Sequence, residues 1–140
     1  MSNQGWIGVD LDETLAHYEK GDYNAFKIGP PILKMVRQVQ QWLKEGKTVK
    51  IFTARANPAT ETPERLERVL QEIRAWCLIH IGQVLDITCS KDYHMYALYD
   101  DRAKQIVPGT GDLVEELLEE ANSDIQDLHF ELNGYKWIED

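Results

Sequence analysis

The chain alternates between short apolar runs and longer segments in which apolar positions recur every three or four residues. Four apolar or β-branched runs predict strands, at residues 6–11, 48–53, 84–89 and 96–99. Amphipathic spacing predicts helices that open at Pro30 and Pro31, at Pro63 after a capping Thr62, and after Asp112. Strands that alternate with helices indicate an α/β fold with a Rossmann-like, mainly parallel sheet sandwiched by helices.

Three segments depart from this alternation. Residues 15–29 mix aromatic, charged and glycine residues without a helical period, and they predict an irregular flap. Residues 105–107 predict a brief fifth strand. In the tail, residues 123–140, an Asn-Gly pair lies between alternating apolar positions, which predicts a C-terminal β-hairpin. We expect one domain over residues 1–140.

Composition and charge narrow the class of protein. With 140 residues, 43% of them hydrophobic, the chain can bury a core, and no apolar run approaches the roughly 20 residues of a membrane span. Cys77 and Cys89 form no CxxC pair, and residues 1–5 lack the pattern of a secretory signal, so we expect reduced cysteines in a cytoplasmic protein. A net charge of −9 repels phosphate backbones, so generic nucleic-acid binding is not expected.

Polar side chains follow each predicted strand. Acids, a hydroxyl and cations stand at the strand ends: Asp10 and Asp12, then Thr53 and Arg55, then Lys91, then Asp100 and Asp101. Because ligands of parallel sheets bind beyond the carboxyl ends of the strands, we expect these residues at one site. Asp10 and Asp12 point to the same face of an extended strand, and burying both is costly unless a cation pairs with them or a pKa has moved.

Two known acid-rich sites do not fit this order. An EF-hand loop that starts at Asp10 needs glycine at its sixth position and glutamate at its twelfth, where the chain has Leu15 and Gly21. A receiver domain of a signalling relay places its acid pair after the first strand, before the threonine and the lysine. Here the pair of Asp100 and Asp101 comes last, after Lys91. The EF-hand interpretation therefore fails, and the order argues against a receiver domain.

The order resembles the four signature motifs of the haloacid dehalogenase superfamily of phosphotransferases. The matching segments are DLDET at 10–14, IFTAR at 51–55, SKD at 90–92 and LYDDR at 98–102. The resemblance runs from about residue 6 to residue 107. DLDETLAH is similar to the first motif of small carboxy-terminal-domain phosphatases, whereas DDR is similar to the fourth motif of deoxyribonucleotidases. The substrate therefore stays open.

The resemblance implies a role for each residue. Asp10 would attack phosphorus and form an aspartyl-phosphate, while Asp12 would protonate the leaving oxygen and then activate water. Thr53 and Lys91 would bind the phosphoryl oxygens. The full set of substrate contacts that we expect is Thr53, Ala54, Arg55, Lys91 and His17. For Arg55, a solvated position on the surface is the alternative.

The resemblance also implies Mg²⁺ as cofactor. A carboxylate that attacks a phosphate dianion meets a repulsion of about 4 kcal/mol for each charge pair at roughly 4 Å, which a divalent cation offsets. The implied ligands are Asp10, the backbone carbonyl of Asp12, and Asp101, with the side chain of Asp12 turned away from the metal. Asp100 either pairs with Lys91 or holds a water of the metal.

The spacing of the motifs bears on the substrate. No interval has room for a cap domain of even about 50 residues, so we expect an open rim covered only by the flap. The expected function is hydrolysis of a phosphomonoester, either a nucleotide or another small phosphate ester. The alternatives are a phosphatase on nucleic-acid ends or another large phosphorylated substrate, and a non-catalytic phospho-ligand-binding or scaffold protein. The tail either contacts a second copy in a homo-oligomer or packs on its own domain.

Overall fold

The computed structural model describes residues 5–19, 21 and 23–133. The chain divides into two compact units, Met1–Asp101 and Arg102–Asp140, and each is described by itself. Every strand and the first two helices belong to the first unit, whereas the second unit contains the last helix. The elements that bear on the candidate site are therefore those of the first unit.

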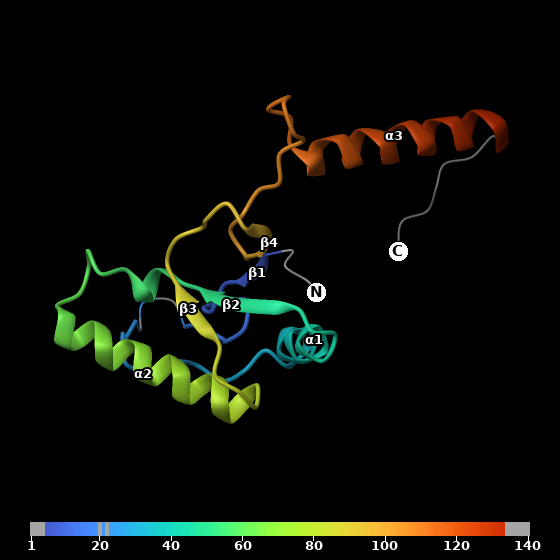
Figure 1. The fold of residues 1–140 in the computed structure, drawn as a ribbon. Coiled ribbons are helices and arrows are strands. Elements are labelled where there is room, and N and C mark those ends of the chain that lie inside the picture. Colours follow the sequence, from blue (N-terminus) through green and yellow to red (C-terminus); the bar gives the residue numbers. More distant parts are fainter. Residues whose placement is uncertain (1–4, 20, 22, 134–140) are drawn as a thin grey trace. The chain divides into compact units, whose positions relative to one another are not determined.

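The first unit is built on a four-stranded, all-parallel sheet (Figure 1). The strands are β1 (Trp6–Val9), β2 (Thr48–Phe52), β3 (Asp86–Thr88) and β4 (Met95–Tyr99), in the order β3-β2-β1-β4. Val9, at the end of β1, pairs with Ile51 on one side and with Tyr99 on the other. The carboxyl ends of β1, β2 and β4 therefore meet at one edge of the sheet. The predicted α/β fold with a parallel sheet is confirmed.

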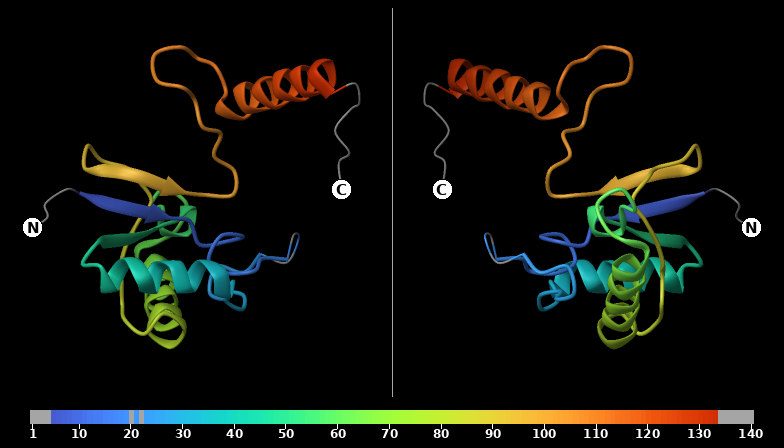
Figure 2. Two further views of the ribbon diagram at one scale, coloured as in Figure 1. Left: turned by 90° about the vertical axis from the view of Figure 1, so that its right-hand side faces the viewer. Right: turned by 90° about the vertical axis from the view of Figure 1, so that its left-hand side faces the viewer.

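Two helices flank this sheet, α1 (Leu33–Lys44) and α2 (Pro63–His80), and Figure 2 shows both on the same face. Their apolar stripes meet the inward residues of β1 and β2. Burial alternates along β2, as expected for a strand with one buried face, whereas all four residues of β1 are buried. One hydrophobic cluster results, and its fully buried members include Val9, Val39, Ile51, Val69 and Ile73. Among the described residues between the predicted motifs, no cap domain is present. Both cysteines are free.

The opposite face of the sheet is covered locally by a side chain of β1. The indole N–H of Trp6 donates to Asp92 Oδ1 at 2.9 Å, and Lys50 Nζ lies 4.6 Å from the Trp6 ring centroid. Asp92 belongs to the short connection 89–94, which joins β3 to β4 at opposite edges of the sheet without a helix. Lys91 lies in this connection.

The helix starts differ in how well the sequence predicts them. At α2, Thr62 Oγ1 accepts the Arg65 N–H at 3.3 Å and Pro63 opens the helix, as predicted. Helix α1 begins at Leu33 rather than at Pro30 and Pro31. The Ile32 N–H instead donates to the Leu15 carbonyl at 2.7 Å, so this segment is tied to the loop after β1 before the helix begins.

The second unit contains α3 (Val114–Asn133). The predicted C-terminal hairpin is wrong over residues 128–133, which are helical, and the rest of it lies outside the described residues. Once nucleated, a helix gains a hydrogen bond for each added residue, and this outweighs a local turn signal. The predicted strand at residues 105–107 is present only as an isolated bridge between Ile106 and Leu113. No helix among the described residues has the length and apolar character needed to cross a bilayer.

Candidate functional site

The loop after β1 folds back tightly on itself at the sheet edge. The Leu11 carbonyl accepts the N–H groups of Leu15 and Ala16, each at 2.9 Å, and all three side chains are buried. Glu13 adopts the left-handed backbone conformation at φ 66°, which is uncommon for a residue other than glycine and is found in turns and at functional sites. The buried apolar anchors hold the loop while its acidic residues remain at the sheet edge.

Three carboxylates meet at this edge. One oxygen from each of Asp10, Asp100 and Asp101 lies within 4.8 Å of the other two. The backbone N–H of Asp10 donates to the Tyr99 carbonyl at 2.9 Å, which joins the ends of β1 and β4. Thr14 Oγ1 donates to Asp10 Oδ2 at 3.3 Å. We call Asp10, Asp100 and Asp101 the acid cluster.

The acid cluster has the chemistry of a divalent-cation site. Carboxylate oxygens are ligands that Mg²⁺ prefers, and acidic side chains this close repel one another unless a cation or a proton lies between them. Burial raises the pKa of Asp10 to about 7, with further contributions from a hydrogen bond to Asp101 and from the charges of Asp100 and Asp101. Without a cation, Asp10 thus holds a proton up to neutral pH. The three residues fit the implied Mg²⁺ site.

This pKa makes cation binding depend on pH. The pKa of Asp10 is higher in the folded than in the unfolded state. In the metal-free protein, Asp10 therefore contributes its full stabilisation below about pH 4, and this contribution is lost as the pH rises towards about 7. A divalent cation competes with the proton, so Mg²⁺ should raise the melting temperature far more at pH 8 than at pH 5.5. Mg²⁺ at about 100 times its dissociation constant stabilises the folded protein by about 2.7 kcal/mol.

Thermal unfolding with and without Mg²⁺ at both pH values measures this effect. Asp112→Asn is the matched control, because this exposed acid belongs to the second unit and should leave the Mg²⁺ response unchanged. Asp101→Asn should reduce the rise in melting temperature that Mg²⁺ produces. An equal Mg²⁺ response at pH 5.5 and pH 8 would contradict the assignment of the acid cluster as a cation site.

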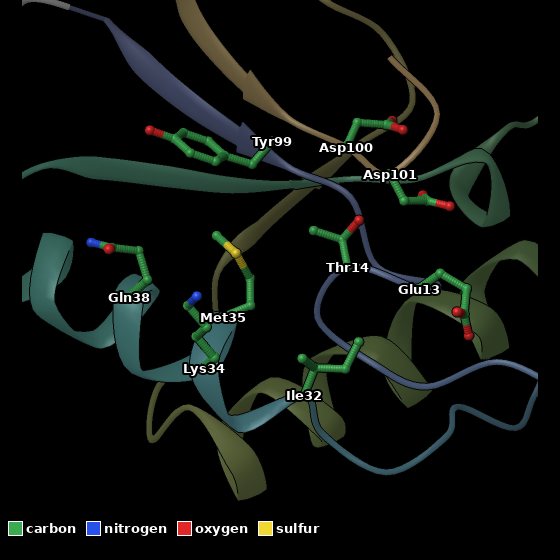
Figure 3. A pocket seen from close by; sticks show the side chains of 9 residues that line it. All are labelled: Glu13, Thr14, Ile32, Lys34, Met35, Gln38, Tyr99, Asp100 and Asp101. Carbon is green, nitrogen blue, oxygen red and sulfur yellow. The ribbon is translucent and has the colours of Figure 1, made fainter. Parts of the chain in front are cut away.

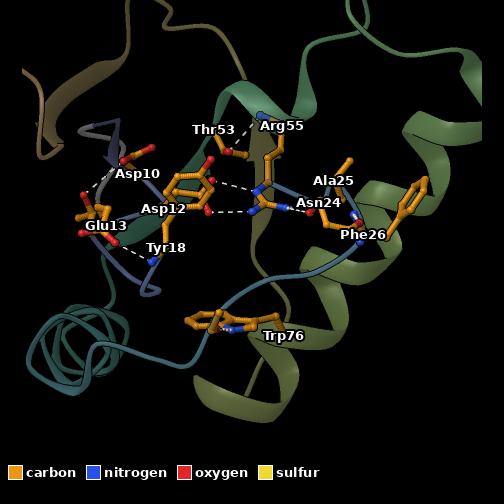
Figure 4. A network of polar contacts seen from close by, with 12 residues as sticks. Asp10, Asp12, Glu13, Tyr18, Asn24, Ala25, Phe26, Thr53, Arg55 and Trp76 are labelled. Carbon is orange, nitrogen blue, oxygen red and sulfur yellow. Dashed lines mark hydrogen bonds and ion pairs between the residues drawn. The ribbon is translucent and has the colours of Figure 1, made fainter. Parts of the chain in front are cut away.

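Asp12 points away from the acid cluster and binds a buried arginine (Figure 4). Arg55 Nε lies 2.8 Å from Asp12 Oδ2, and its Nη2 lies 2.9 Å from Asp12 Oδ1. The same guanidinium donates from Nη1 to the carbonyls of Asn24 at 2.9 Å and Ala25 at 3.2 Å. The ring of Tyr23 lies 4.9 Å from it. One side chain therefore links the second acid of the DxD pair to the flap.

This arrangement changes the interpretation of Arg55. The residue is 5% exposed, so a solvated surface position is wrong. Four of its hydrogen bonds go to the protein itself, and its contact with substrate stays a prediction. Asp12 and Arg55 each lie three residues beyond the end of their strand, and β1 and β2 are parallel neighbours, so the two side chains are within reach of each other.

Thr53 is buried at the end of β2 and shapes the backbone that follows. Its Oγ1 accepts the Arg55 N–H at 3.2 Å and caps a short 3₁₀ turn, Ala54–Ala56, in which Ala54 is exposed. A hydroxyl that accepts one hydrogen bond can still donate another, so Thr53 keeps the donor that a phosphoryl oxygen would need. The structure places it beside the loop that carries Asp12.

Contact of Lys91 with a phosphoryl oxygen stays a prediction. Lys91 is exposed in the connection after β3, and within the described part of the chain it forms no ion pair. His17 is exposed beside Glu13 and Tyr18, in a hollow of about 460 Å³ on the flap.

Comparisons with known proteins assign no family to this chain. No family model matches the sequence, and no curated protein matches it. A solved structure described as a conserved protein coded by a locus from Bacteroides thetaiotaomicron is similar with a TM-score of 0.49 and 19% sequence identity, over 88% of this chain and 98% of that one. The description of that protein names no activity, ligand or partner.

Proposed function

We propose that this chain is a small, capless phosphomonoester hydrolase of the haloacid dehalogenase type, dependent on Mg²⁺ and acting on a nucleotide or another small phosphate ester. The observation that carries the proposal is the separation of roles between the two acids of the DxD pair. Asp10 belongs to the acid cluster, whereas Asp12 is held outside it by Arg55. A nucleophile beside a cation and an acid–base group apart from it are what two-step phosphoryl transfer requires.

The first step would be attack of an Asp10 carboxylate oxygen on phosphorus. A new oxygen–phosphorus bond forms while the ester bond breaks, and the leaving oxygen takes a proton from Asp12. Mg²⁺ held by the acid cluster would neutralise charge on Asp10 and on the phosphoryl group. Thr53 would donate its hydroxyl hydrogen to a phosphoryl oxygen.

The second step would be hydrolysis of the aspartyl-phosphate. Asp12, now ionised, would accept a proton from water as the water oxygen attacks phosphorus. The bond between phosphorus and the Asp10 oxygen would break, which releases inorganic phosphate and restores the Asp10 carboxylate. Each carboxylate oxygen of Asp12 has two acceptor positions, and the bidentate pair with Arg55 occupies one on each. One position per oxygen thus remains for the transferred proton.

The experiment that tests this function is hydrolysis of 4-nitrophenyl phosphate with Mg²⁺, with EDTA and without added metal. We expect turnover with Mg²⁺ and its loss with the chelator, and the control Asp112→Asn should behave like the wild type. A panel of nucleotides, sugar phosphates, phosphopeptides and phosphorylated oligonucleotides then ranks the substrates. No turnover across the panel, with tight retention of one member, would contradict the proposal and favour a phospho-ligand-binding protein.

A further inference from the structure

A hollow of about 410 Å³ lies directly beside the acid cluster (Figure 3). It is bounded by the first turns of α1 on one side and by the end of β4 on the other. Asp100, Asp101 and Thr14 form one end of it, and Thr14 donates to Asp10. A phosphoryl group at Asp10 therefore has this hollow as its neighbour, and the volume lies within the range of small-molecule sites.

The floor of the hollow is apolar. Ile32, Met35 and Tyr99 line it, and Tyr99 keeps 42% of its surface exposed. Behind Tyr99, the ring of Trp42 packs at a centroid distance of 4.7 Å and is itself buried, which fixes the tyrosine ring in place. A fixed aromatic face opposite a methionine suits a flat apolar ring, because the thioether adapts to the shape of its partner and contacts ring edges favourably.

The rim of the hollow carries two hydrogen-bond donors. Lys34 and Gln38 lie one helical turn apart on α1, so their side chains share a face. Within the described part of the chain Lys34 forms no ion pair. A group that accepts hydrogen bonds or carries negative charge, on the far side of a bound ring from the phosphate, would meet these donors.

We propose that this hollow is the leaving-group subsite and that it selects phosphate esters of flat, aromatic alcohols that carry an acceptor or anionic group at the far edge. The inference rests on the proposed function and names the substrate class for it. The apolar floor disfavours small polyhydroxylated leaving groups, whose hydroxyls would lose water without gaining partners. The end of the hollow that Thr14, Asp100 and Asp101 form is the end next to Asp10.

The test of the apolar floor compares two substrates in matched variants. In Met35→Ala, kcat/KM for 1-naphthyl phosphate should fall about 5- to 10-fold, since part of the floor is removed, while kcat/KM for glycerol 2-phosphate should change less than about 2-fold. Leu33→Ala is the control, because Leu33 is exposed on the same helix and does not line the hollow. Equal losses for both substrates, or equal effects of the two variants, would overturn the inference.

The rim is tested separately. Lys34→Ala should remove the preference for a carboxylated aryl phosphate over the parent aryl phosphate, whereas Arg37→Ala, which removes an exposed cation from the same helix, should leave it intact. If both variants keep the preference, or if both lose it, Lys34 does not recognise the far edge.

A binding measurement separates this inference from the proposed function. Fluorescence titration of 1-naphthyl phosphate into Mg²⁺-loaded Asp10→Asn protein reports the subsite without turnover. Adding Met35→Ala should weaken this binding about 5- to 10-fold. If the wild type hydrolyses no ester but this effect is present, the proposed function fails and the subsite stands. If Mg²⁺-dependent hydrolysis is present and Met35→Ala leaves binding unchanged, the subsite fails alone.

Discussion

Asp10→Asn is expected to abolish phosphate-ester hydrolysis, with a loss of at least about 10⁴-fold in kcat, or roughly 5.5 kcal/mol of the barrier. The amide cannot form the aspartyl-phosphate, and it also removes one member of the acid cluster. Hydrolysis of 4-nitrophenyl phosphate at saturating Mg²⁺ measures the loss. Undiminished activity would rule out covalent catalysis by Asp10.

The same substitution should stabilise the folded, metal-free protein near pH 8. There the raised pKa of Asp10, about 7, means that the wild type must ionise a half-buried group beside two other acids. We expect a gain on the order of 1 kcal/mol, since water screens part of the repulsion. A variant that is inactive but more stable cannot have lost activity through unfolding. Asp112→Asn, which lies outside the acid cluster, should change neither activity nor stability.

The acid cluster was predictable because the carboxyl ends of parallel strands lie at the same edge of a sheet. A parallel sheet brings the carboxyl ends of adjacent strands together, and the sequence places Asp10 after the first strand and Asp100 and Asp101 after the fourth. Local apolar runs were enough to locate both strands. The side-chain direction of Asp12, away from the cluster, matches the expectation for a backbone ligand, although ligation itself stays a prediction.

What the sequence does not reveal depends on contacts that are distant along the chain. The start of α1 is set by the hydrogen bond from Ile32 to Leu15, which no local signal predicts.

The burial of Arg55 shows the same limit in the candidate site. As a charged residue after a strand, it reads equally well as a substrate clamp or as a surface residue. The structure instead supplies a carboxylate and two flap carbonyls as its partners, which is the level of hydrogen bonding that a buried guanidinium requires. This pairing makes Arg55 a positioning residue for Asp12.

Arg55→Ala is therefore expected to impair both catalysis and folding. Asp12 would lose the two parallel hydrogen bonds that fix its orientation. We expect this loss to lower kcat about 100-fold, with a smaller change in KM. The free energy of unfolding should fall by about 2–4 kcal/mol, because a partly buried carboxylate and the carbonyls of Asn24 and Ala25 lose their donor. Arg74→Ala is the control, since its exposed pair with Glu67 should contribute less than about 1 kcal/mol.

Guanidinium rescue distinguishes positioning of Asp12 from a loss of folded protein. Added guanidinium at subdenaturing concentration should occupy the vacated space beside Asp12 and restore part of kcat in Arg55→Ala, and it should do nothing for Asp12→Asn. Arg55→Lys should recover less, because an ammonium cannot form the two parallel hydrogen bonds to the carboxylate. The double variant Asp12→Asn/Arg55→Ala should be no slower than Asp12→Asn alone, as expected for two residues that act as a unit. Additive losses in kcat would show instead that Arg55 acts on the substrate independently of Asp12.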